Sequence, residues 1–171
     1  MKKNIVLIGM PASGKSTAGV LLAKKTGYEY TDTDLLLQRA EKALLYEILE
    51  RKGVQGFIEA EERVNMQLNA EHCVIATGGS AVYSEPAMKK FAEKGVIVYL
   101  HVSIEELSRR LADKDIFRRG VVMRKKGETL SELYEERVPL YEKYAEVIVD
   151  CDGLNLEQTV EAIMKGVGEK S

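Results

Sequence analysis

Residues 9–16 read Gly-Met-Pro-Ala-Ser-Gly-Lys-Ser, which fits the phosphate-binding pattern G-x-x-x-x-G-K-[ST]. The glycines let the backbone curl so that successive N–H groups point at one phosphate. Lys15 can then reach the β- and γ-phosphates of a nucleoside triphosphate, and the Ser16 hydroxyl can bind Mg²⁺. The alternative is a tight strand-to-helix turn that uses its glycines for geometry alone. We predict an ATP and Mg²⁺ site whose nucleotide contacts come from Ala12, Ser13, Gly14, Lys15, Ser16 and Thr17.

Asp32 and Asp34 stand two residues apart after a second short apolar run. In extended backbone both side chains point the same way, so one carboxylate could hold Mg²⁺ while the other faces an acceptor hydroxyl. Helix capping by one of them is the alternative, and it is compatible with function. Phosphoryl transfer needs little activation of the nucleophile, so the second aspartate would act mainly by orienting the hydroxyl.

The elements that must position these residues alternate along the chain. Apolar runs predict strands at 5–8, 28–31, 73–76, 96–100 and 147–149. Helical periodicity predicts helices at 15–26, 35–51, 54–70, 86–94, 103–113, 131–144 and 156–167, with Gly53 marking a break. Uniformly apolar strands separated by helices indicate an α/β protein with a parallel sheet covered on both faces. Ligands bind at the carboxyl ends of such strands, so the loop, the aspartates and residues 77–80 should meet in one cleft.

Composition limits the classes of partner. The 171 residues predict about one domain, and 25 Lys and Arg against 27 Asp and Glu give a net charge of −2. A nucleic-acid binder would need a concentrated positive face, so we expect no nucleic acid. The opening apolar run breaks at Gly9, too short for a signal peptide or a membrane span. We expect a cytoplasmic monomer that binds no membrane and whose Cys73 and Cys151 are reduced and buried.

Residues 114–127 carry several Lys and Arg without apolar periodicity. A solvated loop is the usual fate of such a charge run. Beside a triphosphate site, the segment can instead close over the phosphates as a lid and exclude water. Three tyrosines recur later at helical spacing and read as packing residues, namely Tyr134, Tyr141 and Tyr144. His72 and His101 flank strands, and we expect neither to be catalytic.

Taken together, the motifs resemble those of the shikimate kinase family over nearly the whole chain. They are the phosphate loop, Asp32-Thr33-Asp34, Phe57 with Glu61, the Gly-rich run at 76–82, and Arg-Val-Pro-Leu-Tyr at 137–141. The resemblance implies a three-layer α/β/α P-loop kinase with a five-stranded parallel sheet of order 2-3-1-4-5. It also implies one domain over residues 1–171, with substrate-binding helices at about 34–70 and the lid at about 114–127.

The resemblance further implies ATP-dependent phosphorylation of shikimate to shikimate 3-phosphate, a step toward the aromatic amino acids. Lys15, Asp34 and Arg119 would be catalytic, and Ser16 and Asp32 would bind the metal. Arg110 would lie against adenine and Arg119 would reach the nucleotide from the lid. The substrate would be bound by Asp34, Glu61, Gly78, Gly79 and Arg137, the last through its carboxylate.

The sequence departs from the family pattern in three places. Ile58 stands where the family has an arginine that shares the substrate carboxylate. A charge-assisted hydrogen bond of that kind is worth roughly 1.5–3 kcal/mol, so its loss should weaken substrate binding unless Arg63 replaces the arginine. Ser80 replaces a third glycine, a mild change if its φ is negative. The lid reads Arg119-Gly120-Val121-Val122 where the family usually has Arg-Pro-Leu-Leu, so Arg119 matches but Arg118 competes with it as the lid arginine. Two alternatives therefore stay open: a P-loop kinase of another small polyhydroxylated acceptor, and a non-catalytic nucleotide-binding module.

Overall fold

A computed structural model describes residues 2–112, 121–123 and 127–170 of the chain. Within them, five strands form one sheet in the order β2-β3-β1-β4-β5, and every pairing is parallel. The strands are β1 (Asn4–Ile8), β2 (Glu29–Asp32), β3 (Cys73–Ala76), β4 (Gly95–His101) and β5 (Val147–Asp150). The expected sheet, its strand order and its parallel sense are confirmed.

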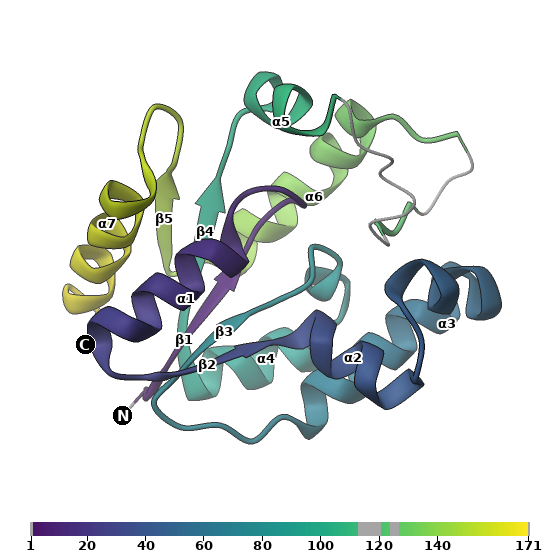
Figure 1. The fold of residues 1–171 in the computed structure, drawn as a ribbon, viewed down its shortest axis with the longest axis horizontal. Coiled ribbons are helices and arrows are strands. Elements are labelled where there is room, and N and C mark those ends of the chain that lie inside the picture. The colour runs from purple at the N-terminus through teal and green to yellow at the C-terminus, as the bar shows by residue number, and fades with distance from the viewer. Residues whose placement is uncertain (1, 113–120, 124–126, 171) are drawn as a thin grey trace.

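Helices cover both faces of this sheet, as Figure 1 shows. They are α1 (Lys15–Thr26), α2 (Thr33–Glu41), α3 (Leu45–Gln67), α4 (Glu85–Lys94), α5 (Ile104–Leu111), α6 (Leu130–Tyr144) and α7 (Leu156–Gly168), with a short 3-10 turn η1 (Ala81–Tyr83). α1 and α7 pack together on one face, and α4 and α6 contact β4 from the other. The three-layer architecture is therefore confirmed.

The main core lies between the sheet and these helices. β1, β3 and β4 are almost wholly buried, as uniformly apolar strands in the middle of a parallel sheet should be. A second, smaller cluster lies under α2 and α3 and includes Leu37, Ile48 and Phe57. Val122, from the segment expected to be a lid, also packs into this second cluster. The main core therefore supports the sheet, and the second cluster supports the region where substrate-binding helices are expected.

The expected helix at 35–51 is wrong in its boundaries. α2 ends at Glu41 and α3 begins at Leu45, with Lys42 between them at φ 52°. No glycine or proline marks this turn, so the sequence carried no strong signal for it. The predicted break at Gly53 is present as φ 71° inside α3, and α3 ends at Gln67 rather than at residue 70.

Both cysteines are buried and free, as the sequence indicated. Within the described part of the chain, no helix is long and apolar enough to cross a bilayer.

Candidate active site

The loop between β1 and α1 has the backbone of a phosphate cradle. Ala12 and Gly14 both have positive φ, at 65° and 92°, and Gly14 caps the amino end of α1. A methyl group on Gly9 would come 2.8 Å from the carbonyl oxygen of Leu100, so a larger residue does not fit there. The positive end of the α1 dipole therefore faces the hollow of the loop, where an anion is stabilised.

Lys15 is buried at the start of α1. Its ammonium group donates to the carbonyl oxygens of Gly9 and Met10, each at 2.8 Å, and to the hydroxyl of Ser13 at 3.2 Å. Burial lowers the pKa of Lys15 to about 8, partly offset by the negative charge of Asp34. A desolvated cation over a phosphate cradle favours a polyanionic ligand.

Ser16 and Asp32 form the oxygen pair expected to hold the metal. The Ser16 hydroxyl donates to Oδ2 of Asp32 at 2.9 Å. The described residues contain no cluster of three or more His, Cys, Asp and Glu suited to a metal. The hydroxyl of Ser16 and the carboxylate of Asp32 fit Mg²⁺, which proteins bind through one or two carboxylates together with substrate phosphates and water.

The expectation that Asp32 and Asp34 share an extended backbone is wrong. Asp32 ends β2 and caps α2, where its Oδ1 accepts from the backbone N–H of Asp34 at 2.9 Å. Asp34 lies in the first turn of α2 and lines the cavity beside the loop. Burial, and next the charge of Asp32, raise the pKa of Asp34 to about 6. Asp32 thus caps α2 and contacts the cavity-lining Ser16, whereas Asp34 lines the cavity itself.

One cavity of about 370 Å³ connects these groups. Its walls come from the phosphate loop, the start of α2, α3, the run after β3, residues 121–122 and α6. The lining includes Lys15, Ser16, Thr17, Asp34, Phe57, Thr77, Gly78, Gly79, Ser80 and Arg137. The carboxyl ends of β1, β2 and β3 therefore converge on one cleft, as the topology required.

The Gly78–Gly79 turn fits closely against four of its neighbours. A methyl group on Gly78 would lie 2.5 Å from Oε2 of Glu61 and 2.7 Å from Oδ1 of Asp34. One on Gly79 would lie 2.9 Å from the Arg137 guanidinium. Tyr141 donates its hydroxyl hydrogen to the Gly79 carbonyl at 2.7 Å. The absence of side chains thus lets this backbone approach a ligand among charged groups.

Arg137 is almost fully buried, and its guanidinium reaches the cavity from α6. It donates to the carbonyl oxygen of Val122 and, at 3.2 Å, to the hydroxyl of Tyr83. No salt bridge joins it to an acidic group among the described residues. A buried guanidinium that forms no such salt bridge is well suited to bind the carboxylate of a ligand.

Comparison with known proteins bears on this arrangement. The family model for shikimate kinase matches residues 11–167. A shikimate kinase of Thermodesulfovibrio yellowstonii is 36% identical over 165 residues, which are 95% of this chain and 94% of that protein. The chain belongs to the shikimate kinase family.

Solved structures agree with this assignment. A shikimate kinase of Acinetobacter baumannii in complex with shikimate has a TM-score of 0.89 at 27% identity, covering 100% of this chain and 96% of that one. The shikimate kinase of Aquifex aeolicus has a TM-score of 0.83 at 31% identity, covering 98% and 97%. A gluconokinase of Sinorhizobium meliloti, at 19% identity and a TM-score of 0.57, shares the fold.

The departures from the shikimate kinase pattern can now be placed. Ile58 is half-buried against the second core cluster and is not among the residues that line the cavity. Arg63 does not replace the missing arginine, because its side chain is 59% exposed and lies 3.8 Å from Glu41, away from the cavity lining. Ser80 has φ −91°, so the change from glycine causes no backbone strain.

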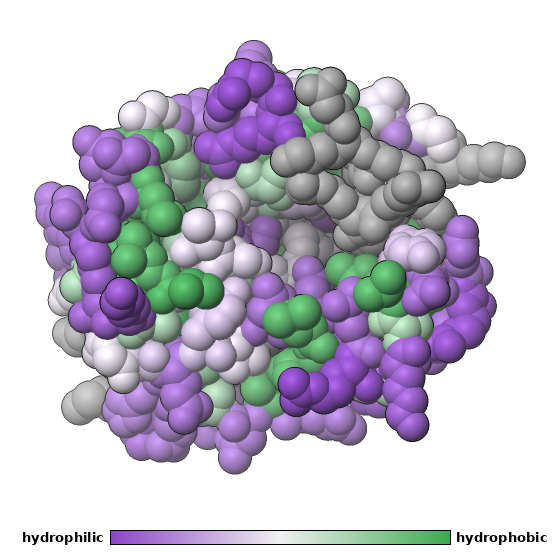
Figure 2. All heavy atoms as spheres, in the orientation of Figure 1, coloured by the Kyte–Doolittle hydropathy of each residue, from purple (hydrophilic) through white to green (hydrophobic). Residues whose placement is uncertain are grey.

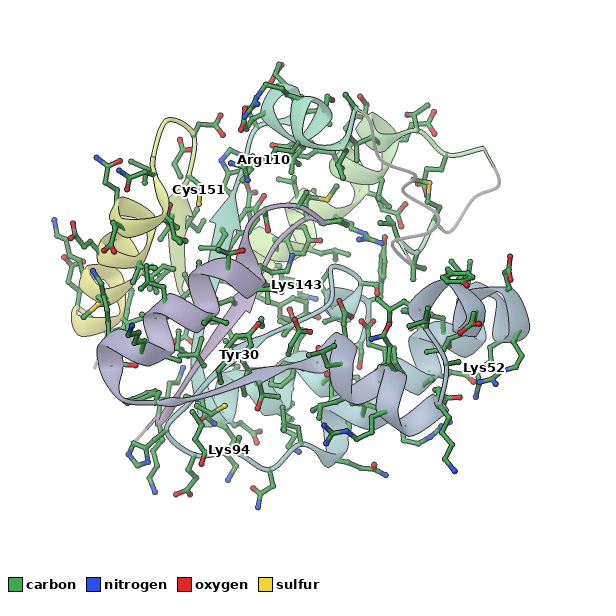
Figure 3. The ribbon with its side chains drawn as sticks, in the orientation of Figure 1. Tyr30, Lys52, Lys94, Arg110, Lys143 and Cys151 are labelled. Carbon is green, nitrogen blue, oxygen red and sulfur yellow. The ribbon has the colours of Figure 1, made fainter. Side chains whose placement is uncertain are left out.

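Of the predicted nucleotide-binding arginines, the structure describes Arg110 but neither Arg119 nor its competitor Arg118. Arg110 donates to the carbonyl oxygen of Ala12 at 2.9 Å and pairs with Glu106, which places it beside the phosphate loop near Cys151 (Figure 3). Arg119 and its competitor Arg118 lie outside the described residues. The sequence did not predict two groups that contact site residues. They are the Tyr141 hydroxyl, which was expected only to pack, and the Val122 carbonyl. Tyr141 belonged to a motif already singled out, whereas a backbone carbonyl leaves no trace in a sequence.

Proposed function

We propose that this chain transfers the γ-phosphoryl group of ATP to a hydroxyl of shikimate, giving shikimate 3-phosphate and ADP. The observation that carries the proposal is the single cavity that holds the phosphate loop, Asp34 and Arg137 together. An acceptor for it needs a hydroxyl near Asp34 and an anionic group near Arg137. Shikimate is a small ring that carries hydroxyls and one carboxylate, so it meets both requirements.

Each side chain has a defined part in this reaction. The loop N–H groups and Lys15 bind the β- and γ-phosphates, for which Lys15 exchanges its carbonyl partners for phosphate oxygens. Ser16 and Asp32 would hold Mg²⁺, which supplies charge neutralisation at the phosphates. Asp34 orients the acceptor hydroxyl and accepts its proton, Gly78 and Gly79 contact the acceptor through the backbone, and Arg137 binds the carboxylate.

The roles of three further parts are proposals of the same kind. Residues 114–127 act as the lid, with Arg119 neutralising charge on the transferred group and Arg110 beside the adenine. Residues 34–70 form the substrate-binding helices of one kinase domain spanning 1–171. Val121 and Val122 support the lid role, since both line the cavity.

We also infer a cytoplasmic monomer that needs neither nucleic acid nor a membrane. The net charge of −2 argues against a nucleic acid as partner. On the face drawn in Figure 2, apolar areas are interrupted by hydrophilic side chains. A stable subunit interface usually has a larger apolar centre.

A coupled assay of ADP release tests the proposed function. With ATP, Mg²⁺ and shikimate at millimolar concentration, ADP should form only when shikimate is present. A panel of hydroxy acids, cyclitols and nucleosides at equal concentration should give much slower release. Release with another acceptor but none with shikimate would contradict the acceptor. Binding of ATP without transfer to any acceptor would favour the nucleotide-binding module.

One observation favours a second candidate, a kinase of another polyhydroxylated acceptor. Only Arg137, among the described cavity-lining residues, is a guanidinium available to a carboxylate. An acceptor with a weaker demand for anion binding would therefore also fit. The acceptor panel separates the two candidates directly.

Ile58→Arg provides an independent prediction. If shikimate is the acceptor, a second guanidinium should lower its KM by about 10-fold or more, because a hydrogen bond to a charged group is worth roughly 1.5–3 kcal/mol. Steady-state kinetics would measure this, with Ile58→Gln as the matched control that adds length and polarity without charge. An unchanged or raised KM in Ile58→Arg would contradict a second carboxylate contact from position 58, and the acceptor panel decides the acceptor itself.

A further inference from the structure

Ser80 forms a contact that a glycine at its position could not form. Its side chain is buried at the start of η1, and its hydroxyl donates to Oε1 of Glu61 at 2.7 Å. Glu61 lies on α3 one turn after Ile58, so both residues occupy the same side of that helix. Relative to the family pattern, the sequence therefore lacks an arginine one turn before Glu61 and has an additional hydroxyl that contacts its carboxyl group.

The second oxygen of Glu61 has a different environment. Oε2 is fully buried and has no hydrogen-bond partner among the described residues. It faces the backbone of Gly78, and Oδ1 of Asp34 faces the same point, because a methyl group there would lie within 2.5 and 2.7 Å of the two oxygens. Two carboxyl groups thus flank one glycine at the wall of the cavity.

We propose that Ser80 and Glu61 are positioning residues for Asp34: the Ser80 hydroxyl anchors Oε1 of Glu61, and an O–H on Oε2 donates toward Oδ1 of Asp34. The donation holds the Asp34 carboxylate in the rotamer that orients the acceptor hydroxyl. This inference rests on the proposed function of Asp34, and it concerns the same site.

The charges around Glu61 support a proton on Oε2. Burial, and next the negative charge of Asp34 on α2, raise the pKa of Glu61 to about 7, whereas the Ser80 hydroxyl on η1 and Arg137 on α6 lower it. Lys15 on α1 acts on Asp34 rather than on Glu61. An isolated buried carboxylate is costly, so Glu61 gains a proton.

The pH dependence follows with a definite sign. Below pH 7, Glu61 is protonated and donates toward Asp34. Above it, Glu61 ionises, and two like charges beside Gly78 repel each other, which displaces the Asp34 carboxylate. We expect the KM for shikimate to rise with pH through an apparent pKa of about 7.

Three variants give distinguishable results. Ser80→Ala removes a hydrogen bond to the ionised form and should move this transition upward by about one pH unit. Ile58→Arg adds a nearby positive charge and should move it downward by about one unit. Glu61→Gln cannot ionise, so the transition should disappear. A purely structural role for Ser80 would change stability, not the position of the transition.

The titration should be followed in two ways, by the shikimate KM and by NMR of isotope-labelled glutamate carboxyls with Glu61→Gln identifying the signal. Opposite displacements in Ser80→Ala and Ile58→Arg support the proposal. Displacements in the same direction, or none, overturn it. The NMR titration is independent of the acceptor, so it keeps the test valid if shikimate is not phosphorylated.

Discussion

Asp34→Asn should lower kcat for shikimate phosphorylation by about 10³-fold, within the range that a positioned proton acceptor contributes. The amide keeps the size of the side chain but can neither accept the proton of the acceptor hydroxyl nor balance the charge of Lys15. Nucleotide binding should survive, because the phosphate loop and the Ser16–Asp32 pair are intact. Steady-state kinetics and calorimetry with ATP would separate the two effects.

The same variant should be more stable than the parent chain, which distinguishes lost chemistry from misfolding. The folded pKa of Asp34 is raised to about 6, so the folded state holds this proton more tightly than the unfolded chain does. Stability therefore falls as pH rises from about 4 to 6 and stays lower above it, by about 3 kcal/mol for two pKa units. Asparagine does not ionise, so the Asp34→Asn protein does not lose this stability as pH rises.

Denaturant unfolding at pH 7.5 in metal-free buffer would measure the gain. Asp150→Asn is the matched control, since the Asp150 side chain is 73% exposed at the end of β5 and should change neither activity nor stability appreciably. An Asp34→Asn protein that keeps more than a tenth of the parent kcat would contradict the role of Asp34.

Arg137→Lys should raise the KM for shikimate by about 30-fold, taking a charge-assisted hydrogen bond as roughly 2 kcal/mol. Lysine retains the charge but loses the planar pair of donors that fits a carboxylate. The effect should be large because Ile58 leaves no second arginine to compensate. The KM for ATP should change little, since the guanidinium lies against Gly79 rather than in the phosphate loop.

A thermodynamic cycle that combines the Arg137→Lys variant with a modified substrate tests whether Arg137 itself binds the carboxylate. The methyl ester of shikimate should be a much poorer acceptor for the parent chain and only slightly poorer for Arg137→Lys. Arg109→Lys is the control, because the Arg109 side chain is 73% exposed on α5. If esterification impairs both proteins equally, Arg137 does not bind the carboxylate.

The parts of the fold that the sequence predicted well are those governed by local pattern. Strands such as Ile5–Ile8 are continuous apolar runs, and the loop ending in Gly14-Lys15-Ser16 has a spacing that backbone geometry demands. The turn at Lys42 was missed because it uses a positive φ without glycine. Local propensity carries no signal for a turn that packing imposes.

The site shows a similar division. Asp32 was placed correctly at the end of β2, but Asp34 was not, because it belongs to a helix that Asp32 caps. The contact between Ser80 and Glu61 joins residues 19 positions apart, and only the packing of η1 on α3 creates it. Such tertiary contacts have no periodic signature, so the sequence shows the substitution but not its partner.

Product analysis by phosphorus NMR tests the central claim most directly. The chain is incubated with ATP, Mg²⁺ and shikimate, and the phosphorus signals are followed until the reaction stops. We predict one new phosphomonoester, coupled to a ring proton of shikimate and equal in amount to the ADP formed. ADP accompanied by free phosphate, or no ADP at all, would contradict transfer of the phosphoryl group to shikimate.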